Sequence, residues 1–162
     1  VFILPNNKNI IMAAQQCVGL TEKQVIVVPT ATVPQGISAM MAVDPDNDDP
    51  QAILAAMTEA ASHVTTAQIT YAARNSDFDG FDIKAGDYLA LEEGKLFGTD
   101  NCLDTLLNKL AADAVEREAS FISLYFGEDV SEEDAQKAAA LFESACPDAE
   151  IRMWQQLQDT EG

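Results

Sequence analysis

Two short polar segments supply the side chains that could bind a partner or ligand. Each follows an apolar run that closes with a proline, and each precedes a helical pattern. Amide, hydroxyl and ammonium groups can hydrogen-bond a partner, and the N–H groups that open a helix favour anions or carboxylates. Short polar side chains also cap helices, so binding and capping both remain open. The candidate residues are Asn6, Asn7, Lys8, Asn9, Thr30, Thr32 and Gln35.

The elements that must position these residues are two strand–helix units. The apolar runs Val1–Leu4 and Val25–Val28 predict buried strands. Helical patterns follow, from Ile10 to Val18 and from Pro34, a residue favoured in a first helical turn, to Met41. Successive units of this kind predict an α/β fold with parallel strands in this part. Loops at the carboxyl ends of such strands line a ligand crevice.

The acidic loop that follows has the beginning of a calcium motif. Asp44, Asp46 and Asp48 match the first three ligand positions. Asp49 stands where the motif requires glycine, and Ala55 stands where it requires glutamate, so calcium is not favoured. Asp49 is instead the predicted cap of the next helix.

The sequence predicts no catalytic residue, no metal site and no cofactor within this chain. It contains no GxxxxGK[ST], GxGxxG or GxSxG motif. The single histidine, His63, lies at the end of a helical pattern without a nucleophile motif and is interpreted as a helix-end residue. Four irregularly spaced aspartates are interpreted as solvated turn residues: Asp77, Asp79, Asp82 and Asp87.

Arg74 is a further candidate, because it stands alone in an acidic stretch where the next cation is Lys84. Guanidinium groups form paired hydrogen bonds and are common at interfaces. Arg74 is therefore either a local ion-pair partner or an interface anchor.

The charge is large and uneven. Nine Lys and Arg residues against 27 Asp and Glu give a net charge of −18 over 162 residues. Residues 1–64 carry two cations and six carboxylates, and residues 65–162 carry seven and 21. This composition excludes nucleic acid and anionic lipid as expected partners, since both require basic surfaces. The acidity serves solubility or repels anions from the second half.

Cysteine use and hydropathy suggest a cytoplasmic location without an integral membrane segment. Cys17, Cys102 and Cys146 lie far apart and form no disulfide or zinc pattern. Cys17 and Cys102 fall in helical apolar patterns and are predicted to be buried. No apolar run approaches the ~20 residues of a membrane span. Because the chain starts inside a strand pattern, we expect residues 1–162 to be a single-domain fragment of a longer protein, with sub-lobes of about 1–64 and 65–162.

The second half predicts an extended segment from Thr65 to Ala73, a β-hairpin across Glu93-Gly94, and a helix from about Asn101. Phe121–Phe126 predicts a buried strand, and Ser131 predicts a capped helix. A last strand is expected near Ile151 to Trp154. The whole pattern predicts an α/β class: an open mixed sheet with helices packed on it and a hairpin in the second half.

Four sequence blocks, spanning about residues 1–150, resemble the C-terminal domain of the dihydroxyacetone kinase-related family, which includes the ATP-binding subunit of bacterial fatty acid kinase. They are LPNNKNIIMAA (4–14), VVPTATVPQGISAM (27–40), YAARNS (71–76) with DGFDIKAGDY (79–88), and FGEDV (126–130). Two departures are that Ala31 stands where relatives usually have lysine, and that the chain ends in QQLQDTEG, not in a GGQP-type motif.

The resemblance implies a fold similar to the DegV-type fatty-acid-binding subunit. It also implies an upstream kinase domain that uses ATP and Mg²⁺, a fatty-acid-binding DegV-like partner, and a homodimer formed through the parent protein. The complete enzyme would make acyl phosphate for phospholipid synthesis, with this domain docking the lipid-carrying subunit. The alternative is a DegV-like module that itself binds a fatty acid or small anion. An independent hydrolase is the weakest hypothesis, because no nucleophile–base pair is evident.

Overall fold

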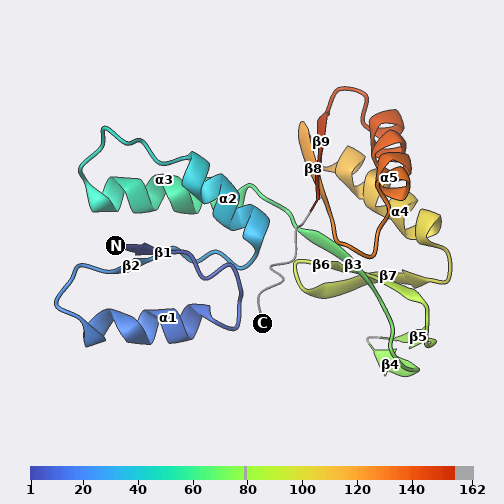
Figure 1. Ribbon diagram of the computed structural model, residues 1–162, viewed down its shortest axis with the longest axis horizontal. Coiled ribbons are helices and arrows are strands. Elements are labelled where there is room, and N and C mark those ends of the chain that lie inside the picture. The colour runs from blue at the N-terminus through green and yellow to red at the C-terminus, as the bar shows by residue number, and fades with distance from the viewer. Residues whose placement is uncertain (79, 156–162) are drawn as a thin grey trace. The chain divides into compact units, whose positions relative to one another are not determined.

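The computed structural model describes residues 1–78 and 80–155. It is a mixed α/β structure with five α-helices within this range (Figure 1). Contacts divide the chain into two compact units, Val1–Thr66 (unit 1) and Ala67–Gly162 (unit 2). Each unit has its own core.

Unit 1 is built on a pair of short parallel strands, β1 (Phe2–Ile3) and β2 (Ile26–Val27). Phe2 lies opposite Ile26, and Ile3 lies opposite Val27. The connection between them contains α1 (Ile11–Cys17) and a 3₁₀ turn, η1 (Val18–Leu20). A parallel pair requires such a crossover, because its strands enter from the same end.

Helices α2 (Val33–Met41) and α3 (Pro50–Ser62) complete unit 1. Both begin with a side-chain cap and an early proline, as the sequence predicts. They pack together around a core of buried residues, which Phe2 of β1 and Leu4 just after it extend. The buried members of this core are Val28, Ala39, Met57 and Ala61.

Unit 2 begins with an antiparallel sheet in the order β3-β6-β7. Its strands are β3 (Ala67–Tyr71), β6 (Tyr88–Glu92) and β7 (Lys95–Asp100). The turn Glu93-Gly94 between β6 and β7 has positive φ at both residues, which confirms the predicted hairpin. A small second hairpin, β4 (Ser76–Phe78) and β5 (Phe81–Ile83), lies between β3 and β6 in sequence.

The rest of unit 2 is a β–α–β arrangement with one additional helix. Strands β8 (Phe121–Phe126) and β9 (Glu150–Gln155) pair in parallel, with α5 (Glu132–Ala145) between them in sequence. Helix α4 (Leu103–Glu116) precedes β8. The core of this region joins both helices to one face of the strand pair, through Leu107, Ala111 and Phe142.

The α/β class, the hairpin and most predicted elements are confirmed, but the described strands do not form the single open mixed sheet that the sequence predicts. The described strands fall into four small sheets, two parallel and two antiparallel. The helix from Ser131 has the expected cap, with the Asp134 N–H donating to the Ser131 hydroxyl. Similarity to the DegV fold stays a prediction.

Several expectations about burial were wrong. Cys17 and Cys102 are exposed, because Cys17 ends a helix that buries only Ala14 and Cys102 lies at the N-cap of α4. Phe121, expected inside a buried strand, is half exposed, because only one face of β8 is covered.

Within the described residues, no helix combines the length and apolarity needed to span a bilayer.

Candidate functional site

The loop after β1 lies against the loop after β2. Asn6 has a left-handed backbone (φ 53°), a conformation that asparagine tolerates better than most residues. Its N–H donates to the hydroxyl of Thr30 at 3.2 Å, and Thr30 is fully buried. The two predicted loops are therefore joined in the structure, as expected for consecutive carboxyl ends of a parallel pair.

Side chains of the second loop satisfy the amides at the start of α2. Gln35 Oε1 accepts from the Ala31 N–H at 2.8 Å, and Thr32 Oγ1 accepts from the Gln35 N–H at 3.3 Å. The Thr32 hydroxyl also lies 2.8 Å from the Thr66 hydroxyl. These N–H groups are thus occupied by the chain's own oxygens. Capping, one of the two interpretations from the sequence, accounts for Thr32 and Gln35.

The Asn6 side chain packs directly on Gly36 of α2. A Cβ atom at position 36 would overlap the Asn6 side-chain amide, so this approach requires glycine. The Asn6 Oδ1 atom is buried and accepts a hydrogen bond from no donor in the described part of the chain. Unpaired buried carbonyls are uncommon, which makes this contact a point of weakness in the loop pair.

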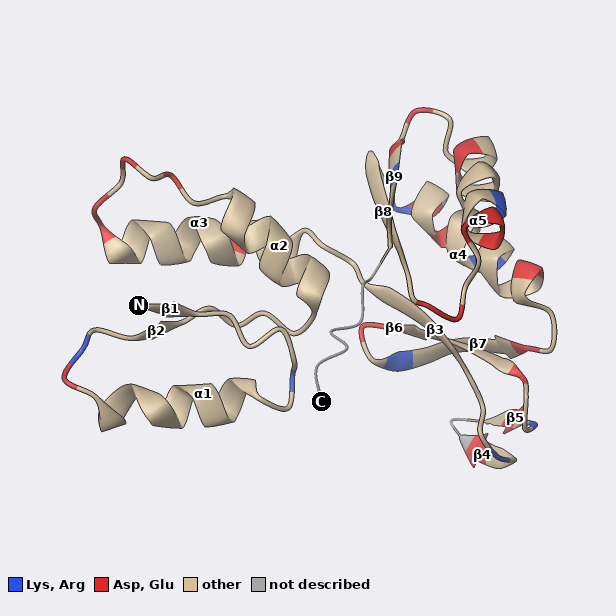
Figure 2. Ribbon diagram, viewed as in Figure 1, with Lys and Arg blue, Asp and Glu red and all other residues tan. Residues whose placement is uncertain are grey.

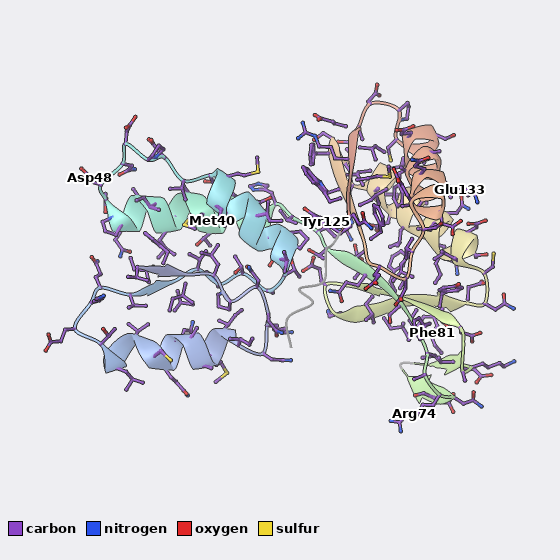
Figure 3. The ribbon with its side chains drawn as sticks, in the orientation of Figure 1. Met40, Asp48, Arg74, Phe81, Tyr125 and Glu133 are labelled. Carbon is purple, nitrogen blue, oxygen red and sulfur yellow. The ribbon has the colours of Figure 1, made fainter. Side chains whose placement is uncertain are left out.

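A shallow groove of about 400 Å³ lies beside this contact, within unit 1. Its lining is apolar except for Asn6 and comprises Leu4, Asn6, Gly36, Ile37, Met40 and Met41. The α2 side chains project freely, and Met41 is 82% exposed (Figure 3 labels Met40). Flexible thioether side chains can fit surfaces of different shapes. The groove is therefore suited to an apolar contact.

Asn7, Lys8 and Asn9 form an exposed turn that leads into α1. The Asn7 Oδ1 atom accepts from the Asn9 N–H at 2.9 Å, and the Asn7 carbonyl accepts from the Ile10 N–H at 3.0 Å. These bonds fix the turn and leave the Lys8 ammonium exposed.

Arg74 lies in unit 2, whereas the loop candidates belong to unit 1. It is exposed, points outward beside β4 (Figure 3), and forms no ion pair within residues 1–78 and 80–155. Of the two interpretations of Arg74, the local ion pair is thus absent from the described structure.

The other polar candidates are used in local structure. Asp44 Oδ1 accepts from the Asp46 N–H, and Asp49 Oδ1 accepts from the Gln51 N–H as the cap of α3. His63 is the exposed C-cap of α3, with its ring Nδ1 2.9 Å from the Glu59 carbonyl oxygen. Among the described residues, no group of three or more His, Cys, Asp or Glu side chains is arranged to hold a metal ion.

The strongest electrostatic cluster lies in unit 2, where Arg117 at the end of α4 pairs with Asp113 and with Glu92 of β6. Partial burial raises the pKa of Glu92 above its ordinary value of 4.5, and the Asp113 carboxylate raises this pKa further, while Arg117 lowers it. This cluster fastens the hairpin to α4, so we assign it a structural role.

Sequence reasoning missed the groove, although it identified Asn6. The signal was present in the pattern Gly36-Ile37-Ser38-Ala39-Met40-Met41, which has more apolar residues than one buried helix face requires. Ala39 takes the buried position, so Ile37, Met40 and Met41 remain outside.

The family of this chain follows from comparison with known proteins. A family model for the C-terminal region of FakA-like fatty acid kinase proteins matches residues 1–160. The chain belongs to this family.

Curated relatives agree with that assignment. Protein YloV of Bacillus subtilis (strain 168) is 36% identical over 153 residues, which are 94% of this chain and 28% of that protein. An uncharacterized protein of Staphylococcus haemolyticus is 31% identical over 151 residues, 92% of this chain and 27% of that protein. A protein of Staphylococcus aureus (strain USA300) is 29% identical over 151 residues, 93% of this chain and 27% of that protein. The chain spans about a quarter of the length of these relatives.

Proposed function

We propose that this domain docks the fatty-acid-binding subunit of a bacterial fatty acid kinase, so that a kinase domain elsewhere can phosphorylate the acyl carboxylate. The observation that carries the proposal is the family match over residues 1–160. Docking requires exposed surface and not reactive groups, and unit 1 offers an apolar groove beside a fixed polar turn. Phosphorylation, phospholipid synthesis and a cytoplasmic location are parts of this proposal.

The proposal places ATP and Mg²⁺ outside this domain. A phosphate at the start of α2 would need free N–H donors, and the N–H groups of Ala31 and Gln35 already donate to side-chain oxygens of Gln35 and Thr32. These occupied N–H groups support placing the nucleotide site elsewhere, and no catalytic role is assigned to the residues around them.

Within unit 1, we assign the contact with the fatty-acid-binding subunit to the Asn7–Asn9 turn and to the groove. Lys8→Gln is the test variant, because it removes the exposed ammonium without changing the hydrogen bonds of the turn. Lys23→Gln is the matched control, since Lys23 is the other cation of unit 1 and is also exposed. Isothermal titration with the fatty-acid-binding subunit should show weaker binding for Lys8→Gln alone. Absence of heat and of co-elution for the unmodified chain would refute the docking function itself.

The apolar lining of the groove also supports a second candidate, a module that holds an acyl chain. Native mass spectrometry of the purified chain separates the two. A co-purified fatty acid that is lost in Met40→Gln would support the module, and its consistent absence would leave docking alone.

A further inference from the structure

The pair β8–β9 has one covered face and one exposed face. Side chains alternate along a strand, and Ile122, Leu124 and Ile151 join the core formed with α4 and α5. Figure 1 shows both helices on one side of these strands. The strand residues that alternate with these three therefore point away from the helices.

These outward residues form what we call the aromatic face: Phe121, Tyr125, Arg152 and Trp154. The three aromatic side chains are 51%, 42% and 49% exposed, respectively. Tyr125 and Trp154 are register partners on adjacent strands, so their side chains are neighbours. Tryptophan, tyrosine and arginine are the residues most enriched at the energetic centres of protein interfaces.

Two members of the aromatic face, Arg152 and Phe121, contact each other. The Arg152 guanidinium lies 5.4 Å from the centre of the Phe121 ring and donates to Glu150 at 2.7 Å. Aromatic side chains have few rotatable bonds, so little conformational entropy is lost when they are covered. Figure 3 shows Tyr125 on β8, away from Glu133 on α5.

Acidic residues flank the aromatic face at both ends, and we call them the acidic rim: Glu128, Asp129 and Asp148. All three are exposed. Glu128 and Asp129 follow the end of β8, and Asp148 precedes the start of β9. Because Glu150 is neutralised by Arg152, the rim dominates the local charge (Figure 2). A complementary surface must be apolar at its centre and carry Lys or Arg around it.

We propose that the aromatic face is a second docking surface, for a protein surface that has an apolar centre and a basic rim. The occupant to which we commit is the fatty-acid-binding subunit, so this inference rests on the proposed function. The aromatic side chains would supply the affinity, and the acidic rim would speed association and fix orientation.

The test is titration of the fatty-acid-binding subunit into this chain by calorimetry and surface plasmon resonance. Trp154→Ala and, separately, Tyr125→Ala should each weaken binding by about tenfold or more. Tyr71→Ala is the aromatic control, because Tyr71 is an exposed tyrosine on β3 of the same unit. Near-wild-type melting of each variant verifies that the fold is retained, and Tyr125→Ala serves if Trp154→Ala unfolds.

The charge of the occupant is tested by a pair of double variants. Glu128→Gln with Asp129→Asn should slow association by about two- to tenfold at low salt. Asp46→Asn with Asp48→Asn makes the same change in net charge in unit 1 and should leave the rate unchanged. Binding of the unmodified chain should also weaken as salt is raised.

The outcomes separate the two claims. If the unmodified chain binds and neither Trp154→Ala nor Tyr125→Ala weakens binding relative to Tyr71→Ala, the aromatic face is refuted and docking stands. If both double variants slow association equally, only net charge matters and the basic-rim assignment is overturned. If the unmodified chain does not bind, the proposed function fails and this inference fails with it.

Discussion

Unit 1 and unit 2 leave different kinds of apolar surface uncovered. Unit 1 exposes aliphatic and thioether side chains on helices, among them Met12 of α1, and Met40 and Met41 of α2. Unit 2 exposes rigid aromatic side chains on a sheet, at Phe121, Tyr125 and Trp154. Methionine surfaces adjust to a partner's shape, whereas aromatic side chains on strands present a fixed one. Under the proposed docking function, unit 1 would therefore adjust to the shape of the partner and unit 2 would orient it.

The two units also differ in net charge. Unit 1 has a net charge of −4 and unit 2 has a net charge of −14. Figure 2 shows acidic residues along α4, α5 and the loops of unit 2, and a concentration in the α2–α3 loop of unit 1. Long-range attraction of a cationic partner is therefore mainly a property of unit 2.

The largest effect is expected from deleting core side chains, one in each unit. Met57→Ala in unit 1 and Leu106→Ala in unit 2 both empty a fully buried site, and each should lower the free energy of unfolding by about 2–5 kcal/mol. Hydrogen exchange followed by mass spectrometry should show faster exchange only in the unit that carries the change. Faster exchange in both units would mean that they unfold as one cooperative structure.

A smaller effect is expected where α2 meets the loop after β1. Gly36→Ala forces the Asn6 side chain out of its position and should lower the free energy of unfolding by about 1–3 kcal/mol. Gly19→Ala is the control, because a Cβ there contacts nothing. Urea denaturation measures both. Equal stability of the two variants would show that Asn6 moves aside without cost, and the loop pair would then be adaptable as well.

The helix caps should differ in their pH dependence. Thr32→Ala removes the cap of α2 and should cost about 1 kcal/mol at every pH, while Thr32→Ser should retain it. Ser131 caps α5 and, as the largest cause, holds the pKa of Asp134 below its ordinary value of 3.8, with Lys137 adding to this.

A lowered folded pKa means that ionised Asp134 stabilises the fold above the unfolded pKa, and that this stabilisation is lost as pH falls through the folded pKa. Ser131→Ala should therefore raise the pKa of Asp134, which NMR titration of its carboxyl carbon would measure. An unchanged titration would show that Lys137 alone sets this pKa.

The smallest effect is expected at the hairpin cluster of unit 2. The Glu92 side chain is only 16% exposed and its pKa is raised by burial and by Asp113. A raised folded pKa lowers the free energy of unfolding as pH rises from 4.5 through the folded pKa. Glu92→Gln should flatten that decline, by about 0.5 kcal/mol or less. Urea unfolding between pH 4 and 7 measures this. If the free energy of unfolding declines more steeply in Glu92→Gln than in the unmodified chain, the attraction to Arg117 outweighs burial.

Local signals explain how much of the fold could be predicted. The strand Phe121–Phe126 and the cap at Ser131 follow from side-chain period and from capping chemistry, both of which act within a few residues. The hairpin β4–β5 was missed because each of its strands has only three residues, too few for a periodic pattern. The division of strands among four sheets depends on contacts between distant segments, which no local pattern encodes.

The candidate site, like the fold, could be predicted only in part. Strand–helix periodicity was enough to bring Asn6 and Thr30 together, because consecutive parallel strands end at one edge. Capping by Thr32 and Gln35 could be recognised only once the acceptors of the Ala31 and Gln35 N–H groups were known. The aromatic face was not predicted, because the mostly apolar sequence of β8 indicated a buried strand. Ser123 and Tyr125, two residues apart, were the signal for a face that is not fully buried.

The segments that connect the β4–β5 hairpin to β3 and β6 are hydrogen-bonded to each other, which makes the hairpin suitable for an insertion. The Ala72 N–H donates to the Asp87 carbonyl at 2.8 Å, and the Gly86 N–H donates back to the Ala72 carbonyl at 2.8 Å. The chain thus leaves the sheet and re-enters it at one clamped point, where β3 and β6 are already in register. Lengthening a loop whose ends are clamped costs only about 0.6 kcal/mol for each doubling. This hairpin is accordingly the place to splice in a fluorescent reporter, since β3 and β6 would stay paired around the insertion.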